Sequence, residues 1–250
     1  MATEDLKVLY KSNNFIIVNK NHDLIINSED DSRISLHRQL VKTFPYLINK
    51  KLRFGFYFPH RLDYSTSGVM CIALSKKSCA AASLAFQEKS TRKYYLALVR
   101  GHVSKKCVEL NNPIGERNEK GLKIMSCHSE QLLPAHSKLL VLERGLYESY
   151  PATKILLRPL TGRRHQLRVH CHAIGHTIIG DYTYSQRKDV TPPRMFLHSY
   201  RLIIPNDIEM LDLSTEDPFT EISTPGWLVV EKLQSLDDEA IRLLEEDWNG

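Results

Sequence analysis

Short apolar runs of the strand type recur along this chain, and most of them are separated by turns rather than by long helices. Regular alternation of strands with helices, which a doubly wound parallel sheet requires, does not occur. The strand patterns lie at residues 6–10, 15–19, 69–74, 94–99, 138–142, 154–157 and 195–204. The helical patterns lie at residues 33–48, 75–87, 165–174 and 236–248. We therefore predict an α+β fold with a mixed, mainly antiparallel sheet and short flanking helices.

Capping residues and composition refine this pattern. Ser75 can cap the second helix by accepting a backbone N–H, and Gly175 can end the third. On the second helix we expect the packing face to consist of Ala80, Ala81, Leu84 and Ala85. Residues 104–134 are polar and irregular, so we expect loops with one short strand there. The last helix is acidic, and we expect it to dock within the molecule or to stay away from a polyanion.

The overall composition limits the classes of protein to which the chain can belong. Its 250 residues correspond to one or two domains, and 42% hydrophobic with 25% charged residues is typical of globular proteins. A disordered, collagen-like or coiled-coil protein is not expected. The 34 basic and 29 acidic residues give a net charge of +5. Such a charge is compatible with RNA or DNA as a partner but does not establish one.

The cysteines and the N-terminus bear on the compartment. The cysteines number five and contain no C-x-x-C pair, which favours reduced thiols over a disulfide framework or a cysteine-rich zinc site. Glu4 and Asp5 stand where a signal peptide carries positive charge, and the longest apolar runs are far shorter than the roughly 20 residues that span a bilayer. We expect a soluble protein in the cytoplasm, with the nucleus as the alternative.

Asp63 lies in the segment His60–Gly68, between a cation and a cluster of hydroxyl side chains. One interpretation is an aspartate that stabilises a turn by accepting backbone N–H groups, which is the common role in such loops. The other is a reactive carboxylate that a nearby guanidinium keeps ionised, and such a partner lowers a carboxyl pKa by roughly one to three units. An ionised carboxylate can act as a nucleophile or a base. Composition alone leaves both interpretations open.

Four further motifs follow this segment in order. H-R-L-D-x-x-T-S-G at 60–68 precedes K-x-Y-x-A-x-V-x-G at 93–101, T-G-R-x-H-Q-L-R-x-H at 161–170, G-H-x-I-x-G-D-x-x-Y at 175–184 and R-x-x-L-H at 194–198. The ordered set resembles the RluA-type RNA pseudouridine synthases. Ile17–Lys20 is also similar to the strand that leads into the "NKP-x-G" turn of this family. The sequence departs from the family pattern at Asn21 and Asp23, usually Pro and Gly, and at Ser137, usually Thr.

The resemblance covers about residues 6–205 and implies both a fold and an activity. The implied fold is the pseudouridine synthase fold, with a mixed, mainly antiparallel sheet, flanking short helices and loops around a catalytic cleft. We expect a single catalytic domain over residues 1–250, in which 206–250 form a C-terminal extension with the acidic helix. The implied activity is isomerisation of uridine to pseudouridine in RNA. That reaction neither gains nor loses atoms, so no cofactor and no metal are expected, and we expect a monomer without membrane contact.

The resemblance also implies roles for individual residues. Asp63 corresponds to the catalytic aspartate, Arg168 to its ion-pair partner, and Tyr95 to the active-site tyrosine that stacks on the uracil. Leu167 corresponds to the residue that packs on the other face of the base, and Arg61 to the side chain that fills the space left by the extruded nucleotide. Three other residues are assigned to substrate binding, namely His60, Thr66 and Arg163.

Two alternatives compete with this interpretation. A catalytically silent RNA-binding protein could retain the fold, although loss of Asp63 would be its natural signature. A metal site is the second alternative, because His165, His170, Cys171, His172 and His176 form H-x4-H-C-H-x3-H. Gly175 interrupts that helix, and no H-E-x-x-H or paired-carboxylate pattern completes a site, so we expect no metal. Basic side chains near the motifs predict either a solvated charged face or an RNA track.

Overall fold

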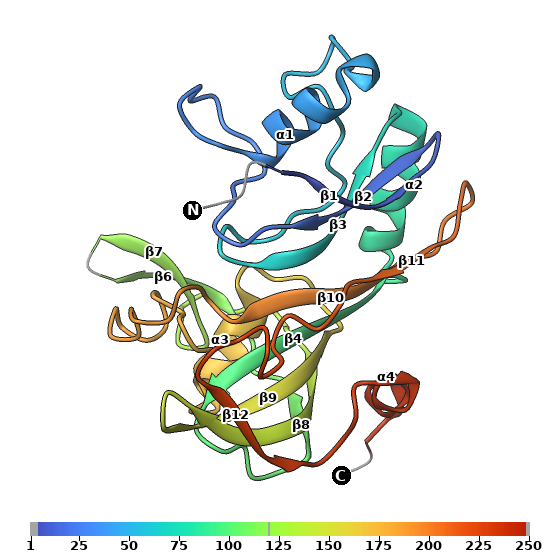
Figure 1. Cartoon of the computed structure of the whole chain (residues 1–250). Coiled ribbons are helices and arrows are strands. Elements are labelled where there is room, and N and C mark those ends of the chain that lie inside the picture. The colour runs from blue at the N-terminus through green and yellow to red at the C-terminus, as the bar shows by residue number, and fades with distance from the viewer. Residues whose placement is uncertain (1–4, 120, 249–250) are drawn as a thin grey trace. The chain divides into compact units, whose positions relative to one another are not determined.

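The computed structural model describes residues 5–119 and 121–248. It divides into two compact units (Figure 1). The first unit consists of Met1–Lys93 and His198–Glu216, and the second of Tyr94–Leu197 and Asp217–Gly250. Among the described residues, no helix is long and apolar enough to cross a membrane.

The sheet of the first unit has the strand order β1-β2-β3-β10-β11. Its strands are β1 (Lys7–Lys11), β2 (Phe15–Lys20), β3 (Ser67–Ala73), β10 (Leu197–Ile204) and β11 (Leu211–Ser214). The neighbours run antiparallel except β3 and β10, which are parallel. Helix α1 (Leu36–Thr43), the 3-10 turn η1 (Pro45–Leu47) and helix α2 (Lys76–Gln87) complete this unit. The sheet is therefore mixed but mainly antiparallel, as the strand pattern predicts.

Helix α2 covers one face of this sheet with a side that differs from the predicted one. Its buried residues are Ser78, Ala82 and Ala85, of which the alanines join a core with apolar side chains of β2, β3 and β10. The predicted face was wrong in part, because Ala80 and Leu84 are exposed. Five of the twelve helical residues are alanine or leucine, and they surround much of the helix, so the apolar pattern does not specify one side.

The N-terminus of α2 yields a stability prediction. Ser75 is the N-cap, and its Oγ accepts the Ser78 N–H at 3.0 Å, which confirms the predicted cap. Replacing Ser75 by alanine leaves this N–H without its acceptor and should lower the free energy of unfolding by about 1 kcal/mol. Aspartate can accept the same bond, so Ser75→Asp should retain most of the stability. Urea unfolding of both variants tests this, and an equal loss in the two would contradict the capping role.

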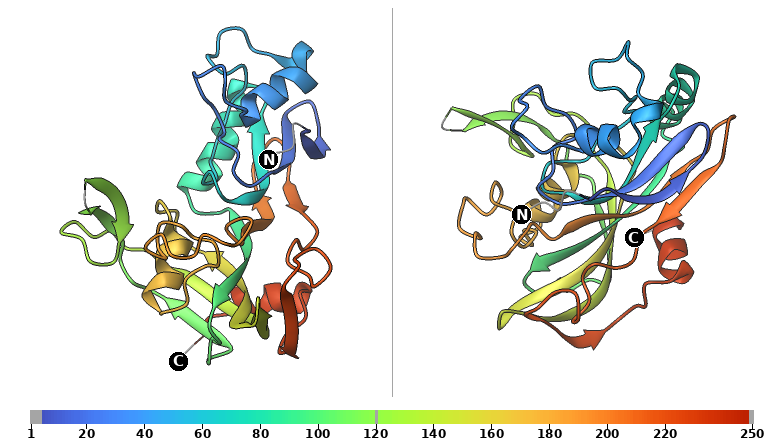
Figure 2. Two further views of the ribbon diagram at one scale, coloured as in Figure 1. Left: turned by 60° about the vertical axis from the view of Figure 1, so that its left-hand side comes forward. Right: turned by 45° about the horizontal axis from the view of Figure 1, so that its top comes forward.

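The second unit has a sheet in the order β4-β9-β8-β12, and β5 also pairs with β8. These strands are β4 (Arg92–Arg100), β5 (Cys107–Leu110), β8 (Ser137–Tyr147), β9 (Tyr150–Pro159) and β12 (Trp227–Lys232), and all described pairs are antiparallel. Strands β6 (Gly115–Glu119) and β7 (Leu122–Ser126) form a separate hairpin, visible in Figure 2 as the yellow-green pair. Helices α3 (Gln166–Ala173) and α4 (Asp238–Glu245) complete the unit.

Two features of this unit differ from the predicted pattern. Residues 104–134 contain β5, β6 and β7 rather than one short strand, because β6 is polar and largely exposed and shows no apolar alternation. The predicted strands at 138–142 and 154–157 are parts of one long hairpin. Its turn consists of Glu148 and Ser149, both with positive φ. Turns of this kind usually contain Asn or Gly, so the sequence gives no turn signal here.

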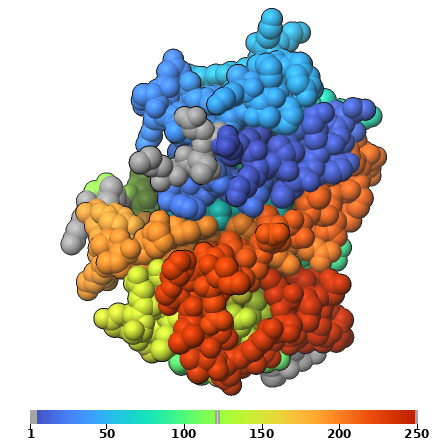
Figure 3. Space-filling view, viewed as in Figure 1, coloured from blue at the N-terminus to red at the C-terminus, as the bar shows by residue number. Residues whose placement is uncertain are grey.

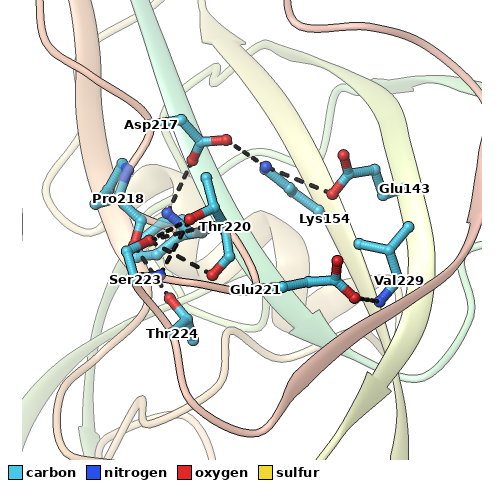
Figure 4. Close-up of polar contacts among 10 residues, drawn as sticks. Glu143, Lys154, Asp217, Pro218, Thr220, Glu221, Ser223, Thr224 and Val229 are labelled. Carbon is cyan, nitrogen blue, oxygen red and sulfur yellow. Dashed lines mark hydrogen bonds and ion pairs between the residues drawn. The ribbon is translucent and has the colours of Figure 1, made fainter.

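The C-terminal extension is divided between the two units: residues 206–216 belong to the first, and the residues from Asp217 onward belong to the second. Lys154 of β9, which is 3% exposed, forms ion pairs with Asp217 and with Glu143, whose carboxylate lies 3.5 Å away (Figure 4). In the space-filling view, the red residues after 217 lie over the yellow-green strands β8 and β9 (Figure 3). Asp237 caps α4 by accepting the Ala240 N–H, and Arg158 donates to the Leu244 carbonyl at the end of this helix. The acidic helix is thus docked within the molecule.

Candidate active site

The loop that carries Asp63 lies in the first unit. Residues 58–66 connect the bridge between Tyr57 and Ala73 to the start of β3. Asp63 is half-buried, and its carbonyl accepts the Thr66 N–H at 3.2 Å, which closes a turn around it. Arg61 is exposed, whereas Thr66 is buried. The loop therefore places a carboxylate and a guanidinium two residues apart on a segment whose backbone is held in place.

Lys20 fixes the same loop from the end of β2. Its side chain is 1% exposed, and its Nζ donates to the carbonyls of Asn21, Leu24 and Tyr64 at 2.9, 2.8 and 3.1 Å. The last of these carbonyls belongs to the residue directly after Asp63. Sequence reasoning assigned no role to Lys20, and the only signal was the N-K pair of the family turn. A buried ammonium group is tolerated because backbone carbonyls satisfy its donors.

The parallel strands β3 and β10 approach each other closely where the loop ends. Gly68 has φ +115°, and a Cβ built on it would lie 2.2 Å from the Ser199 carbonyl oxygen. Only glycine can occupy such a position. Beside it, Ser67 Oγ lies 2.6 Å from His198 Nδ1, and His198 Nε2 lies 2.6 Å from Thr215 Oγ1. His198 of the last motif is thus a buried structural partner of the Asp63 loop.

Tyr95 and the residues of α3 lie in the second unit. Tyr95 is a half-buried residue of β4 and packs against the core cluster that contains Leu167. Gln166 organises the turn before α3, because its Oε1 accepts from Thr161 Oγ1 at 2.7 Å and from the Arg163 N–H at 3.0 Å. Arg163 in turn donates from Nε to the Pro134 carbonyl. The structure therefore brings Tyr95 and Leu167 to one apolar cluster and fixes the T-G-R turn beside it.

Arg168 is buried and is oriented by Asp181. Its Nε and Nη2 donate to the two carboxylate oxygens of Asp181 at 2.7 and 2.8 Å. Asp181 is 0% exposed and also accepts the N–H groups of Thr183 and Tyr184. The ring centroid of Tyr184 lies 5.1 Å from the guanidinium carbon. Sequence reasoning quoted Asp181 and Tyr184 in a motif but gave them no role, and that motif was the available signal.

The histidines near α3 have separate partners. His165 Nδ1 lies 3.1 Å from the Tyr184 hydroxyl, and His176 Nδ1 lies 2.8 Å from the Arg100 carbonyl. His170 is buried against Ser137 Oγ and the Asn112 carbonyl, and burial lowers the pKa of this histidine. Across residues 5–119 and 121–248, no three His, Cys, Asp or Glu side chains are placed to share a metal ion. The H-x4-H-C-H-x3-H pattern thus consists of histidines with individual hydrogen-bond partners.

Two basic side chains, Arg100 and Arg158, have intramolecular partners. Arg100 forms a bidentate ion pair with Asp189 at 2.9 and 2.5 Å. Arg158 donates to the carbonyl at the end of α4, as described above. A groove of about 620 Å³ lies within the second unit, between the β6–β7 hairpin, α3 and residues 182–187. Its lining includes cationic and aromatic side chains, namely Arg117, His128, His172, Tyr182 and Arg187.

The fold and these motif positions define a class of protein. The family model for RNA pseudouridylate synthase matches residues 14–173, which is more than half of the chain, so the protein belongs to this family of isomerases. The predicted RluA-type resemblance and the pseudouridine synthase fold are thereby confirmed.

Individual relatives agree with this assignment. The chain is 42% identical over 254 residues to RNA pseudouridylate synthase domain-containing protein 1 of Mus musculus, covering 98% of this chain and 83% of the relative. It is 33% identical over 207 residues to the dual-specificity RNA pseudouridine synthase RluA of Escherichia coli (strain K12), covering 80% and 86%. Among solved structures, human RNA pseudouridylate synthase domain containing 1 matches with a TM-score of 0.86 and 39% identity, covering 98% of this chain and 96% of that chain.

Proposed function

We propose that this protein isomerises uridine to pseudouridine in RNA and that Asp63 is the catalytic carboxylate. The observation that carries the proposal is the placement of Asp63 on a turn whose following residues are held, Tyr64 by the Lys20 ammonium and Gly68 by its close approach to Ser199. Family membership supplies the reaction class, and one of the named relatives is the dual-specificity RNA pseudouridine synthase RluA.

The reaction requires a carboxylate but no added atoms. The bond between uracil N1 and ribose C1′ breaks, the base rotates, and C5 then bonds to C1′. C5 releases its proton and N1 takes one up, so atoms and charges balance without a cofactor. Asp63 can act on the ribose or on the uracil, and in either case it must be ionised. We assign to Arg168 the role of its ion-pair partner, since a guanidinium favours the charged form of a carboxylate.

The remaining assignments concern the base and the nucleic acid. Tyr95 supplies a ring for stacking on the uracil and a hydroxyl for proton transfer at C5, and Leu167 packs on the base. Arg61, Thr66 and Arg163 belong to the substrate-binding surface. We further propose that the two units act as one catalytic domain, as a monomer on RNA, in the cytoplasm or the nucleus.

Release of the C5 proton gives a direct test. The protein is incubated with RNA in which uridine carries tritium at C5, prepared from cells that lack the protein. Tritium release into water, followed by mapping of pseudouridine at defined positions, is the expected result. Binding of the same RNA without tritium release would contradict the proposal and would identify a catalytically silent RNA-binding protein.

Arg61 yields a prediction about nucleotide extrusion. If its planar guanidinium fills the gap left by the target nucleotide, its contribution depends on whether that nucleotide begins stacked. Unstacking costs a few kcal/mol in a stem-loop and much less in a flexible strand. Arg61→Ala should therefore slow single-turnover isomerisation by about tenfold or more on a stem-loop and by less than about threefold on an unstructured RNA with the same uridine.

A matched control distinguishes this role from a phosphate contact. Arg33 is another exposed arginine of the first unit, and Arg33→Ala should affect both RNAs equally. A phosphate contact at Arg61 would likewise give equal losses on the two RNAs, and it would reduce the salt-dependence slope of binding by about one. Equal losses with a shallower slope would refute the extrusion role.

A further inference from the structure

The hydrogen-bond ladder of β3 has a gap on the side that faces away from β2. On the side away from β2, β3 pairs with β10 only at Ser67 and Gly68. At its other end, the Ala73 N–H donates to the Tyr57 carbonyl at 3.0 Å. Backbone N–H groups of alternate residues point to the same side of a strand. The Cys71 N–H therefore points to this side, between the two paired ends, and requires an acceptor because the residue is completely buried.

His60 supplies that acceptor. The Cys71 N–H donates to His60 Nε2 at 2.9 Å. The imidazole also stacks on Phe86 of α2, with ring centroids 4.7 Å apart and an interplanar angle of 23°. Burial, together with the nearby Lys93 charge, lowers the pKa of His60 to about 3. The ring is therefore neutral at physiological pH, with Nε2 unprotonated and able to accept.

We propose that His60 is a positioning residue, whose Nε2 takes the place of a strand carbonyl beside β3 and thereby holds the Asp63 loop, rather than a residue that binds RNA. The hydrogen bond from Cys71 to the His60 ring holds the chain at His60, three residues before Asp63. The Lys20 ammonium and the Leu24 N–H fix the Tyr64 carbonyl one residue after it. Asp63 thus lies between two anchored points of the backbone. The inference rests on the proposed function only in that Asp63 is taken as the catalytic group.

Two variants of His60 distinguish its role as a hydrogen-bond acceptor from the packing of its ring on Phe86. His60→Phe keeps an aromatic ring on Phe86 but removes the acceptor, whereas His60→Gln offers an amide oxygen to the Cys71 N–H. The first measurement is hydrogen exchange at the Cys71 amide by NMR, with the Ala73 amide as internal reference. We expect His60→Phe to raise the exchange rate at Cys71 by at least tenfold and leave Ala73 nearly unchanged, and His60→Gln to keep Cys71 protected. Unchanged protection of Cys71 in His60→Phe would overturn the inference.

The second measurement is single-turnover kinetics on an RNA that the wild-type protein modifies. His60→Phe should lower the rate at saturating RNA at least tenfold with the Kd for RNA within twofold of wild type, and His60→Gln should recover most of the rate. A raised Kd with an unchanged saturating rate would make His60 an RNA-binding residue and overturn the inference. If His60→Phe does not fold, the His60→Gln variant provides the test. A tenfold loss of rate in His60→Gln, with the Cys71 amide still protected, would overturn the positioning role.

The exchange measurement keeps this inference distinct from the proposed function. A wild-type protein that releases no tritium from its RNA would refute the proposed function and leave the Cys71 result standing. A wild-type protein that is active, together with a fully active His60→Phe variant, would refute the positioning role alone.

Discussion

Replacing Asp63 by asparagine is expected to abolish pseudouridine formation, with a residual rate below about one per cent of wild type. Asparagine has nearly the same shape as aspartate but is neither a nucleophile nor a base at neutral pH. A hundredfold loss corresponds to about 2.7 kcal/mol in the activation barrier. The measurement is single-turnover tritium release at saturating RNA, with the Kd for the RNA determined in parallel. The Kd should change little, because the amide keeps the volume and the turn.

Asp30 offers the matched control. It is another turn aspartate of the first unit, and its Oδ1 accepts the Ser32 N–H at 3.0 Å. A hydrogen bond from the Ser32 hydroxyl, together with the one from the Ser32 N–H, lowers the pKa of the Asp30 carboxyl. Asparagine can accept the same bonds, so Asp30→Asn should leave activity unchanged. If Asp63→Asn behaves like Asp30→Asn, then Asp63 only stabilises its turn and the proposed role is refuted.

Replacing Arg168 by lysine is expected to reduce activity at least tenfold, or about 1.4 kcal/mol in the barrier, although the charge is retained. The guanidinium is held by two parallel hydrogen bonds to Asp181. A lysine ammonium is a point charge on a flexible chain and cannot reproduce that geometry. The saturating rate of isomerisation is the measurement, and circular dichroism confirms that the variant is folded.

Arg163 provides the comparison for this second prediction. It belongs to the same motif but donates to the Pro134 carbonyl instead of a carboxylate. Arg163→Lys should therefore have a smaller effect than Arg168→Lys. Wild-type activity in Arg168→Lys combined with an inactive Arg163→Lys would mean that the other arginine of the motif is the one required.

Sequence patterns predicted the buried elements of the fold better than the exposed ones. The strand at 69–74 and the Ser75 cap were predicted because burial and capping leave local signals, namely apolar runs and a hydroxyl before a helix. The β6–β7 hairpin was missed because its first strand is polar and largely exposed. The packing side of α2 was only partly predicted, since neighbouring strands select Ser78 and Ala82 from a helix that is apolar on several sides.

In the candidate site, the features that depend on local sequence were predicted, and the contacts between residues distant in sequence were not. Tyr95 and Leu167 were placed correctly on a strand and a helix, because their motifs are local. The partners of buried polar groups could not be predicted in this way. Asp181 follows Arg168 by thirteen residues, and Lys20 reaches the carbonyl of a residue forty-four positions away. Such contacts depend on how the chain returns on itself, which residue spacing does not encode.

The boundaries between the two units at residues 93, 197 and 216 limit which fragments of the protein can contain a complete unit. Each unit is built from two separate stretches of sequence, so neither can be excised as a continuous fragment. A truncation after residue 197 would remove nearly all of β10 and the whole of β11 from the first unit, and with them the Ser199 backbone against which Gly68 packs. The same cut would remove β12 and α4 from the second unit. During synthesis, neither unit can complete its sheet until the residues beyond 197 have left the ribosome.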